Sequence, residues 1–317
     1  MSYISKLGLG GSKFGSISGL PMSDSESLIQ RAWTKGIRFY DTANIYGQGD
    51  SERAMAPLLK LGDDVIVGTK GGYSMPQGAS GSKGANRIKI ILRHLIKKLH
   101  FLKRLLLKVR SRTTSTQNFS YEYLKAAAEE SASRLGVTQL PLYMLHSPSK
   151  EDLMKGEGLA SLYRLKQEGL ISQIGVALLD VFDLKSVTNS NELDCIQVQL
   201  NILSPASSFS FLKTIKESSD IQIVVRQPYA GGLLIHTSIE NENENTYMHA
   251  LHQCAKGHQL TVPDLALMTM LHCPFIDKVL VGTTKEVHLD KNIEIANSSF
   301  TIDAYNEVME LMQKFEK

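Results

Sequence analysis

Residues 36–47 read GIRFYDTANIYG. The stretch opens on a glycine that ends a helical pattern, continues as the apolar run Ile37–Tyr40 and turns polar at Asp41. An apolar run without alternation is typical of a strand in a parallel sheet that is covered on both faces. Seven further runs of this kind are Lys6–Gly10, Val65–Thr69, Leu142–His146, Ile171–Val176, Cys195–Gln199, Ile221–Arg226 and Lys278–Val281.

Helical patterns separate these runs. The boundary signals are Ser23 or Asp24 before a helix that runs to Lys35, Ser120 before a helix that ends at Gly136, and Pro263 in a first turn. Eight strand–helix units in about 300 residues predict a single (β/α)8 barrel. The alternative is a doubly wound open sheet, but residues 8–13 (GLGGSK) lack the G-x-G-x-x-G fingerprint that such a fold would carry here.

Composition supports one ordinary globular domain over residues 1–317. The chain is 42% hydrophobic and 21% charged, which excludes disorder of the whole chain. It has no uncharged apolar stretch long enough to span a membrane, and its first residues show no basic-then-apolar signal. Its three cysteines form no C-x-x-C pair. We therefore expect a cytoplasmic protein without a disulfide framework.

Four ionisable residues lie where a barrel places its active site, at or just after the carboxyl ends of strands. They are Asp41, Tyr46, Lys70 and His146. A tyrosine beside a buried ammonium can have a lowered pKa and donate a proton near neutral pH. The aspartate would hold the lysine, and the histidine would orient a carbonyl. Each residue alone is more often structural, but together and in this order they predict a catalytic tetrad.

Three motifs that carry these residues resemble the aldo-keto reductase family. Residues 36–47 are followed by Ser51-Glu52, residues 67–71 read VGTKG, and residues 142–148 read LYMLHSP. The resemblance covers nearly the whole chain in family order. It implies a (β/α)8 barrel that reduces aldehydes or ketones with a nicotinamide cofactor, NADP(H) rather than NAD(H).

The resemblance also implies a role for each member of the tetrad. Tyr46 would be the general acid, Lys70 would tune it, Asp41 would hold Lys70, and His146 would position the carbonyl. Alcohol oxidation is the chemically equivalent reverse reaction. The alternative is a cofactor-binding regulatory or scaffold subunit of the same fold, which would dock through a basic helix.

The cofactor site implied by the resemblance draws on the other strand ends. Its residues would be Gly10, Gly11, Ser12, Gln197, Arg226, Gln227, Tyr229, Gly231, Leu233, Gly282, Thr283, Thr284, Lys285, His288 and Asn292. In it Gln197 would hold the nicotinamide carboxamide, Arg226 would stack on the nicotinamide ring, and Lys285 would meet a 2′-phosphate.

Two parts of this cofactor site depart from the family pattern. The family's Ser-Asn pair after the fifth strand is here Ala177-Leu178, so one polar contact to the carboxamide is expected to be missing. The Lys and Arg that mark NADP preference in some relatives are replaced by Gly282 and His288.

Residues 79–119 predict a basic amphipathic insertion after the third strand. Residues 65–121 carry 12 Lys/Arg and no acidic residue, and residues 88–109 repeat an apolar side chain every three or four positions. A helix packed on the barrel or on a second subunit is one interpretation. A lid that meets an anionic partner is another, the partner being an acidic carrier protein, a membrane surface or a phosphorylated ligand. Nucleic acid is disfavoured, because residues 83–112 hold one aromatic side chain.

A further group of residues contains possible metal ligands, but its spacing does not predict a metal site. His249, His252, Cys254 and His258 lie close in the sequence without a matching second pair of ligands. We interpret them as exposed polar residues of a helix, and the sequence predicts no metal site.

Overall fold

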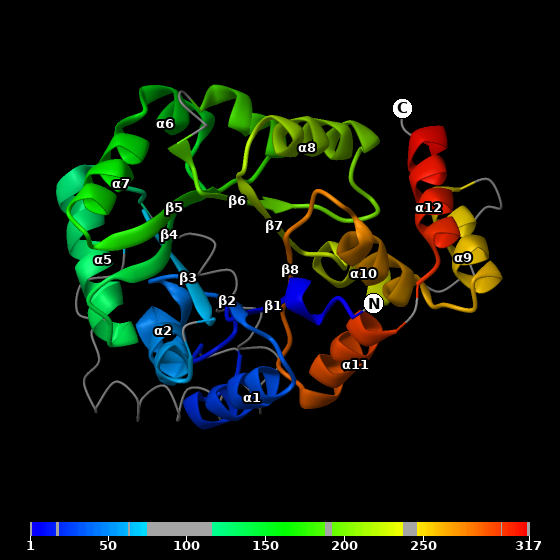
Figure 1. Ribbon diagram of the computed structural model, residues 1–317, viewed down its shortest axis with the longest axis horizontal. Coiled ribbons are helices and arrows are strands. Elements are labelled where there is room, and N and C mark those ends of the chain that lie inside the picture. The colour runs from blue at the N-terminus through cyan, green and yellow to red at the C-terminus, as the bar shows by residue number, and fades with distance from the viewer. Residues whose placement is uncertain are drawn as a thin grey trace, which may run out of the picture.

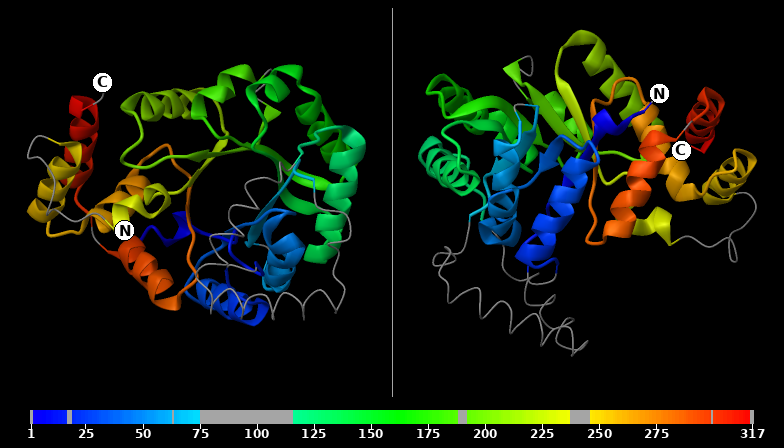
Figure 2. Two further views of the ribbon diagram at one scale, coloured as in Figure 1. Left: turned by 180° about the vertical axis from the view of Figure 1, so that it is seen from behind. Right: turned by 60° about the horizontal axis from the view of Figure 1, so that its bottom comes forward.

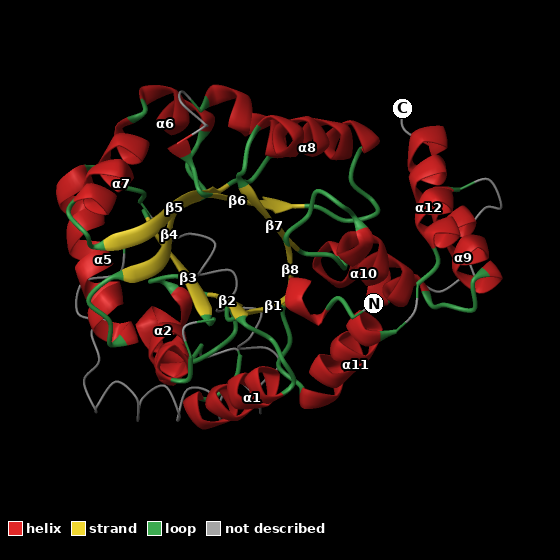
Figure 3. Cartoon of the chain, viewed as in Figure 1, coloured by secondary structure: helices red, strands yellow, loops and turns green. Residues whose placement is uncertain are grey.

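The computed structural model describes residues 2–16, 19–62, 64–74, 116–187, 192–236, 246–298 and 300–315. Within them eight parallel strands close into one barrel in sequence order, with helices outside (Figures 1 and 3). The strands are β1 (Leu7–Gly10), β2 (Phe39–Asp41), β3 (Ile66–Gly71), β4 (Leu140–His146), β5 (Ile171–Ala177), β6 (Cys195–Gln199), β7 (Gln222–Arg226) and β8 (Lys278–Val281). The predicted (β/α)8 barrel is confirmed, and the alternative open sheet is excluded.

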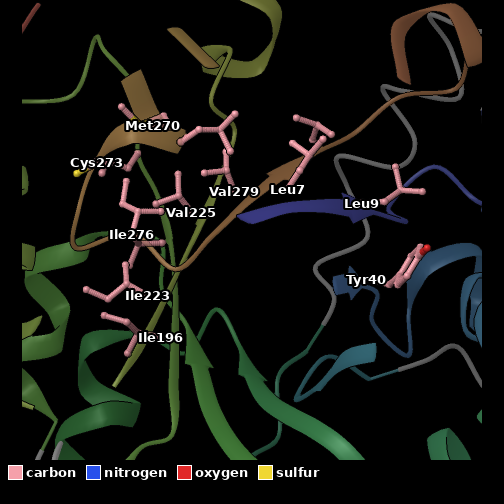
Figure 4. Packing of buried hydrophobic residues seen from close by; sticks show 14 of the residues in the cluster. Leu7, Leu9, Tyr40, Ile196, Ile223, Val225, Met270, Cys273, Ile276 and Val279 are labelled. Atoms are coloured by element: carbon pink, nitrogen blue, oxygen red, sulfur yellow. The ribbon is translucent and has the colours of Figure 1, made fainter. Parts of the chain in front are cut away.

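The predicted apolar runs correspond one to one with these strands. β6 and β8 have the predicted bounds, and the other strands differ from the prediction by one or two residues at one or both ends. The runs lack alternation because both strand faces are buried. One face packs against the surrounding helices, as Figure 4 shows for Leu7, Val225 and Val279, and the other fills the barrel interior.

The helices surround the barrel in chain order, as Figure 2 also shows. They are α1 (Met22–Thr34), α2 (Asp50–Met55), α5 (Tyr121–Leu135), α6 (Lys150–Lys155), α7 (Glu157–Gln167), α8 (Ala206–Ser218), α9 (Tyr247–Gly257), α10 (Val262–His272), α11 (Glu286–Asn297) and α12 (Ile302–Phe315). None of these described helices has both the length and the apolar character needed to cross a membrane.

Two of the three helix boundary predictions are confirmed. The Ser120 hydroxyl accepts a hydrogen bond from the Tyr123 amide at the start of α5, and Pro263 lies in the first turn of α10. The prediction that Ser23 or Asp24 caps α1 is wrong. This helix already begins at Met22, its N-cap is Pro21, and no side-chain hydrogen bond caps it.

The Ser51-Glu52 part of the first motif is structural. Glu52 is fully buried at the start of α2. Its carboxylate accepts hydrogen bonds from the Arg134 Nε of α5 at 2.5 Å and from the Thr69 hydroxyl of β3 at 2.6 Å. The Ser51 hydroxyl donates to the Gly11 carbonyl at 3.0 Å. These bonds fix α2 to β3, α5 and the end of β1, and so hold the segment that carries Tyr46.

The predicted insertion of residues 79–119 lies outside the described residues except at its end. Residues 116–118 pair with the segment that follows β3. Tyr73 and Gln117 form an antiparallel bridge, and the Asn118 amide donates to the Gly72 carbonyl at 2.8 Å. The chain therefore leaves the barrel and returns to it at one place, at the carboxyl end of β3.

Candidate active site

The side-chain alternation of the strands places the site residues in the barrel interior. The interior cluster holds Phe39, Leu142, Met144, Cys195, Val224 and Leu280. Successive side chains of a strand point to opposite faces, so a residue two positions beyond an interior residue also faces inward. Asp41, His146, Gln197 and Arg226 each lie two residues beyond a member of this cluster. They form the layer above it, at the carboxyl end of the barrel.

Asp41 and Lys70 form a buried ion pair in that layer. The Lys70 Nζ lies 2.6 Å from Asp41 Oδ1 and donates a second hydrogen bond to the Thr42 carbonyl at 2.8 Å. The Lys70 side chain is 1% exposed. The Gln197 amide also donates to Asp41 Oδ1, at 2.7 Å. A buried ammonium and carboxylate are tolerated when their remaining hydrogen-bonding capacity is used, as it is here.

Tyr46 is brought over this pair by a tight turn. Gly47, Gln48 and Gly49 after it all have positive φ. A Cβ on Gly47 would lie 2.6 Å from the Phe14 carbonyl oxygen, so the turn requires glycine at that position. The Lys70 Nζ lies 5.3 Å from the centre of the Tyr46 ring, and the rings of Tyr46 and His146 meet edge to face at 5.7 Å. The structure thus brings all four predicted tetrad residues together.

The expectation that the pKa of Tyr46 is lowered is wrong for this structure. Burial of the phenol raises its pKa above the usual value, and this outweighs the opposing effect of the Lys70 charge. Tyr46 therefore keeps its proton throughout the neutral range. It is available as a proton donor, and Lys70 counteracts the effect of burial.

His146 is held in its neutral form. Burial and then the positive charges of Lys70 and Arg226 lower its pKa to about 3. Its Nδ1 is buried and makes no hydrogen bond among the described residues. The ring of Tyr73 packs edge to face on the imidazole at 4.8 Å. A neutral imidazole beside the phenol can hydrogen-bond an uncharged carbonyl oxygen.

Gln117 and Tyr73 belong to this site and were not among the predicted site residues. The Gln117 amide donates to the carbonyl oxygens of His146 and Ser147, both at 2.9 Å, and Ser147 has a φ of 54°. These bonds support the left-handed backbone directly after His146. The position of Tyr73, three residues after Lys70, could have indicated its role. Gln117 gave no local signal, because it lies at the far end of the predicted insertion, remote in the sequence from the tetrad motifs.

The predicted cofactor residues follow β1, β6, β7 and β8 around the same end of the barrel. Gly11 is not open to a cofactor. A Cβ on it would come within 2.6 Å of Met55 Cε and Ser51 Oγ, so this glycine serves packing against α2. The side chain of Leu178 is buried, and its backbone makes hydrogen bonds to two of the predicted cofactor residues. Its amide donates to the Gln197 carbonyl at 2.8 Å, and its carbonyl accepts from Arg226 at 3.0 Å.

The loop after β7 is joined to the middle of α11. The Tyr229 hydroxyl donates to Asn292 Oδ1 at 2.5 Å. No side chain caps the amino terminus of α11, where Lys285 is the exposed N-cap residue. Amides at such a helix start bind anions. A Cβ built on Gly231, Gly232 or Gly282 meets nothing within 4 Å, so the backbone is open at these three positions.

The sequence comparison assigns the family. The profile described as the aldo/keto reductase family matches residues 6–313. The chain belongs to the aldo/keto reductase family. Among its curated relatives, D-threo-aldose 1-dehydrogenase from Pseudomonas sp is 24% identical over 312 residues, covering 92% of this chain and 89% of the relative. The NADH-specific methylglyoxal reductase of Escherichia coli (strain K12) is 28% identical over 292 residues, covering 85% and 81%.

Solved structures agree on the aldo/keto reductase fold. An aldo-keto reductase from Bacillus halodurans in its holo form superposes with a TM-score of 0.71 at 22% identity, over 96% of this chain and 91% of that one. A glycerol dehydrogenase from Gluconobacter oxydans gives a TM-score of 0.71 at 18% identity, over 98% and 91%. With its family and its named relatives, this chain is an NAD(P)-dependent oxidoreductase that acts on small carbonyl compounds.

The residues of the site fit a nicotinamide dinucleotide. The unpartnered buried nitrogen of His146 offers a hydrogen bond to a bound substrate. The open backbone at Gly231, Gly232 and Gly282 leaves room for a ligand, and the uncapped start of α11 suits one of its phosphates. The side chain of Leu178 cannot hydrogen-bond a carboxamide, so Gln197 would be the polar group left for it.

Proposed function

We propose that this reductase transfers a hydride between a nicotinamide cofactor and an aldehyde or ketone, with Tyr46 as general acid. The observation that supports this most is the convergence of Tyr46, Lys70, Asp41 and His146 in one buried layer at the carboxyl end of the barrel. A bound NAD(P)H supplies the hydride to the carbonyl carbon. The residues of this chain supply the proton, stabilise the charge and orient the carbonyl.

Tyr46 gives its phenol proton to the carbonyl oxygen as negative charge develops there. The buried Lys70 ammonium, 5.3 Å from the ring centre, stabilises the phenolate that remains. Asp41 fixes the ammonium from the other side at 2.6 Å. The neutral His146 binds the carbonyl oxygen and so orients the carbonyl for both transfers. In alcohol oxidation the same groups act in reverse.

We also infer a preference for NADPH over NADH. Lys285 is exposed at the start of α11, where an ammonium beside uncapped helix amides would attract a 2′-phosphate. It would act in place of the basic side chains that Gly282 and His288 have replaced. The relative from Escherichia coli is NADH-specific, so the preference must be measured on this chain.

A cofactor titration followed by turnover tests the proposal. Purified protein is titrated with NADPH and with NADH by nucleotide fluorescence, and a panel of small aldehydes and ketones is then added. We expect tighter binding of NADPH and its oxidation by at least one carbonyl. Binding without turnover across the panel would favour the cofactor-binding regulatory subunit, and binding of neither nucleotide would overturn both functions.

For the insertion we propose an anionic partner. Residues 65–121 carry 12 Lys/Arg and no acidic residue. Gln117, near the end of the insertion, pairs with Tyr73, which precedes the insertion and packs against His146. A substrate presented by an acidic carrier protein, a membrane surface or a phosphorylated ligand would therefore meet this segment at the mouth of the site. Each Lys or Arg near an anionic surface contributes about 1 kcal/mol to such binding.

Vesicle binding tests this partner. The wild type is expected to co-sediment with phosphatidylserine vesicles, less as salt is raised, and not with phosphatidylcholine vesicles. Deletion of residues 83–112 should abolish binding. Changing Lys97, Lys98, Lys103 and Arg104 together to glutamine keeps the chain length and should weaken binding at least tenfold. Binding that survives both changes would contradict the proposal, and its absence in the wild type would exclude a membrane surface as the partner.

A further inference from the structure

Helices α9 and α12 pack side by side on the outside of the barrel, in all views of Figures 1 and 2. The rings of Tyr247 and Phe315 meet at 5.5 Å across this contact. The pair lies away from the strands that carry the tetrad. Any chemistry between these two helices is therefore separate from carbonyl reduction.

Three metal-ligating side chains converge between the two helices. Cys254 and His258 are four residues apart, at the end of α9, and so lie on one face of it. Glu307 comes from α12 and lies 49 residues beyond His258 in the sequence. One ligand atom from each lies within 4.8 Å of the others, and His258 Nε2 is 2.8 Å from Glu307 Oε2.

The burial of this cluster differs from the sequence prediction. His249, His252, Cys254 and His258 were expected to be exposed polar residues. This is wrong, because Cys254 is 2% exposed and the three histidines are half-buried. The side chains of His258 and Glu307 are 23% and 47% exposed. The sulfur is thus buried, and the other two ligands are partly exposed. An ion can therefore reach the cluster from solvent on the side of His258 and Glu307.

The chemistry of the donor set points to one class of ion. A thiolate, a neutral imidazole and a carboxylate together carry two negative charges, which match a divalent cation. Sulfur and nitrogen ligands disfavour Mg²⁺ and Ca²⁺, which take oxygen. Three protein ligands of this kind with a fourth position left open are typical of Zn²⁺. The three ligand atoms lie within 4.8 Å of one another, and the partly exposed side chains of His258 and Glu307 can adjust this spacing around an ion.

A redox-active thiol explains the cluster less well. Reactive cysteines lie in electropositive surroundings that favour the thiolate. Here burial and the Glu307 carboxylate raise the pKa of the Cys254 thiol to about 12.

We propose that Cys254, His258 and Glu307 bind a zinc ion that joins α9 to α12. Nothing in the reductase reaction uses these residues. The sequence pattern on α9 did not predict the site, because its third ligand comes from a distant helix. The ion would link α12, the last described helix, to α9. Its expected effect is therefore to stabilise the packing of these two helices.

Cobalt is the probe for this site, because thiolate ligation of Co²⁺ gives a charge-transfer absorption that zinc does not. Tag-free full-length protein, reduced and stripped of metal, is titrated with Co²⁺. We expect one equivalent to bind with this absorption and Zn²⁺ to displace it. Zn²⁺ should also raise the midpoint of thermal unfolding.

Single substitutions assign the ligands. Cys254→Ala should abolish the absorption and the thermal shift, while His258→Gln and Glu307→Gln should each weaken Co²⁺ binding at least tenfold. His249→Gln, on the same helix but outside the cluster, is the matched control and should bind as the wild type does. Far-ultraviolet circular dichroism establishes that each variant is folded. The proposal is overturned if Co²⁺ gives no such absorption, or if the absorption survives in Cys254→Ala.

Discussion

Tyr46→Phe is expected to lower kcat for carbonyl reduction by about 10²–10⁴-fold, the range that a positioned general acid contributes. The change removes one oxygen atom and keeps the ring that packs against His146 and lies near Lys70. The dissociation constant of NADPH should therefore stay within about twofold. Stopped-flow oxidation of NADPH and a fluorescence titration measure the two quantities.

The control for this variant is Tyr163→Phe. Tyr163 lies on α7 and is 43% exposed. Its substitution should change neither kcat nor cofactor binding. If Tyr46→Phe kept more than a tenth of wild-type kcat, or lost cofactor binding together with turnover, the role assigned to Tyr46 would be wrong.

Lys70→Met is expected to lower kcat by a similar factor for a different reason. The Lys70 charge opposes the effect of burial on Tyr46, so its removal raises the pKa of the phenol further and makes it a weaker acid. The alkaline limb of the pH profile, where Tyr46 loses its proton, should move to higher pH. Because the pKa of His146 is about 3, His146 should contribute no limb between pH 5 and 8.

Lys70→Met also leaves Asp41 as a buried carboxylate without its cation. A buried charge whose partner is removed typically costs about 3–5 kcal/mol of stability. The double variant Asp41→Asn with Lys70→Met removes both charges and should recover much of that loss without recovering turnover. If the double variant regained wild-type kcat, Lys70 would have only a structural role.

Much of the fold followed from simple patterns. Strands that are buried on both faces appear as unbroken apolar runs, and for that reason the runs from Lys6–Gly10 to Lys278–Val281 gave all eight strands. The start of α5 was predicted from the side chain that caps it, Ser120. The start of α1 was missed, because no side chain caps it and the helix begins directly after Pro21.

The tetrad was predictable because each member lies at or just after a strand end and carries its own chemistry. Interactions between segments distant in the sequence were not predictable. Gln117 supports His146 from the far end of a long insertion, and Glu307 joins Cys254 and His258 from another helix. The pKa of Tyr46 was predicted in the wrong direction, because the sequence shows the neighbouring Lys70 but not how deeply the phenol is buried.

Deuterium transfer tests the central claim most directly. The protein is incubated with NADPH that carries deuterium at both hydrogen positions of nicotinamide C4 and with an aldehyde from the panel that it reduces, and the alcohol is analysed by mass spectrometry. We expect one deuterium on the carbinol carbon, formed at a rate that falls with Tyr46→Phe and does not fall with Tyr163→Phe. An alcohol without deuterium, or one formed equally fast by Tyr46→Phe, would contradict it.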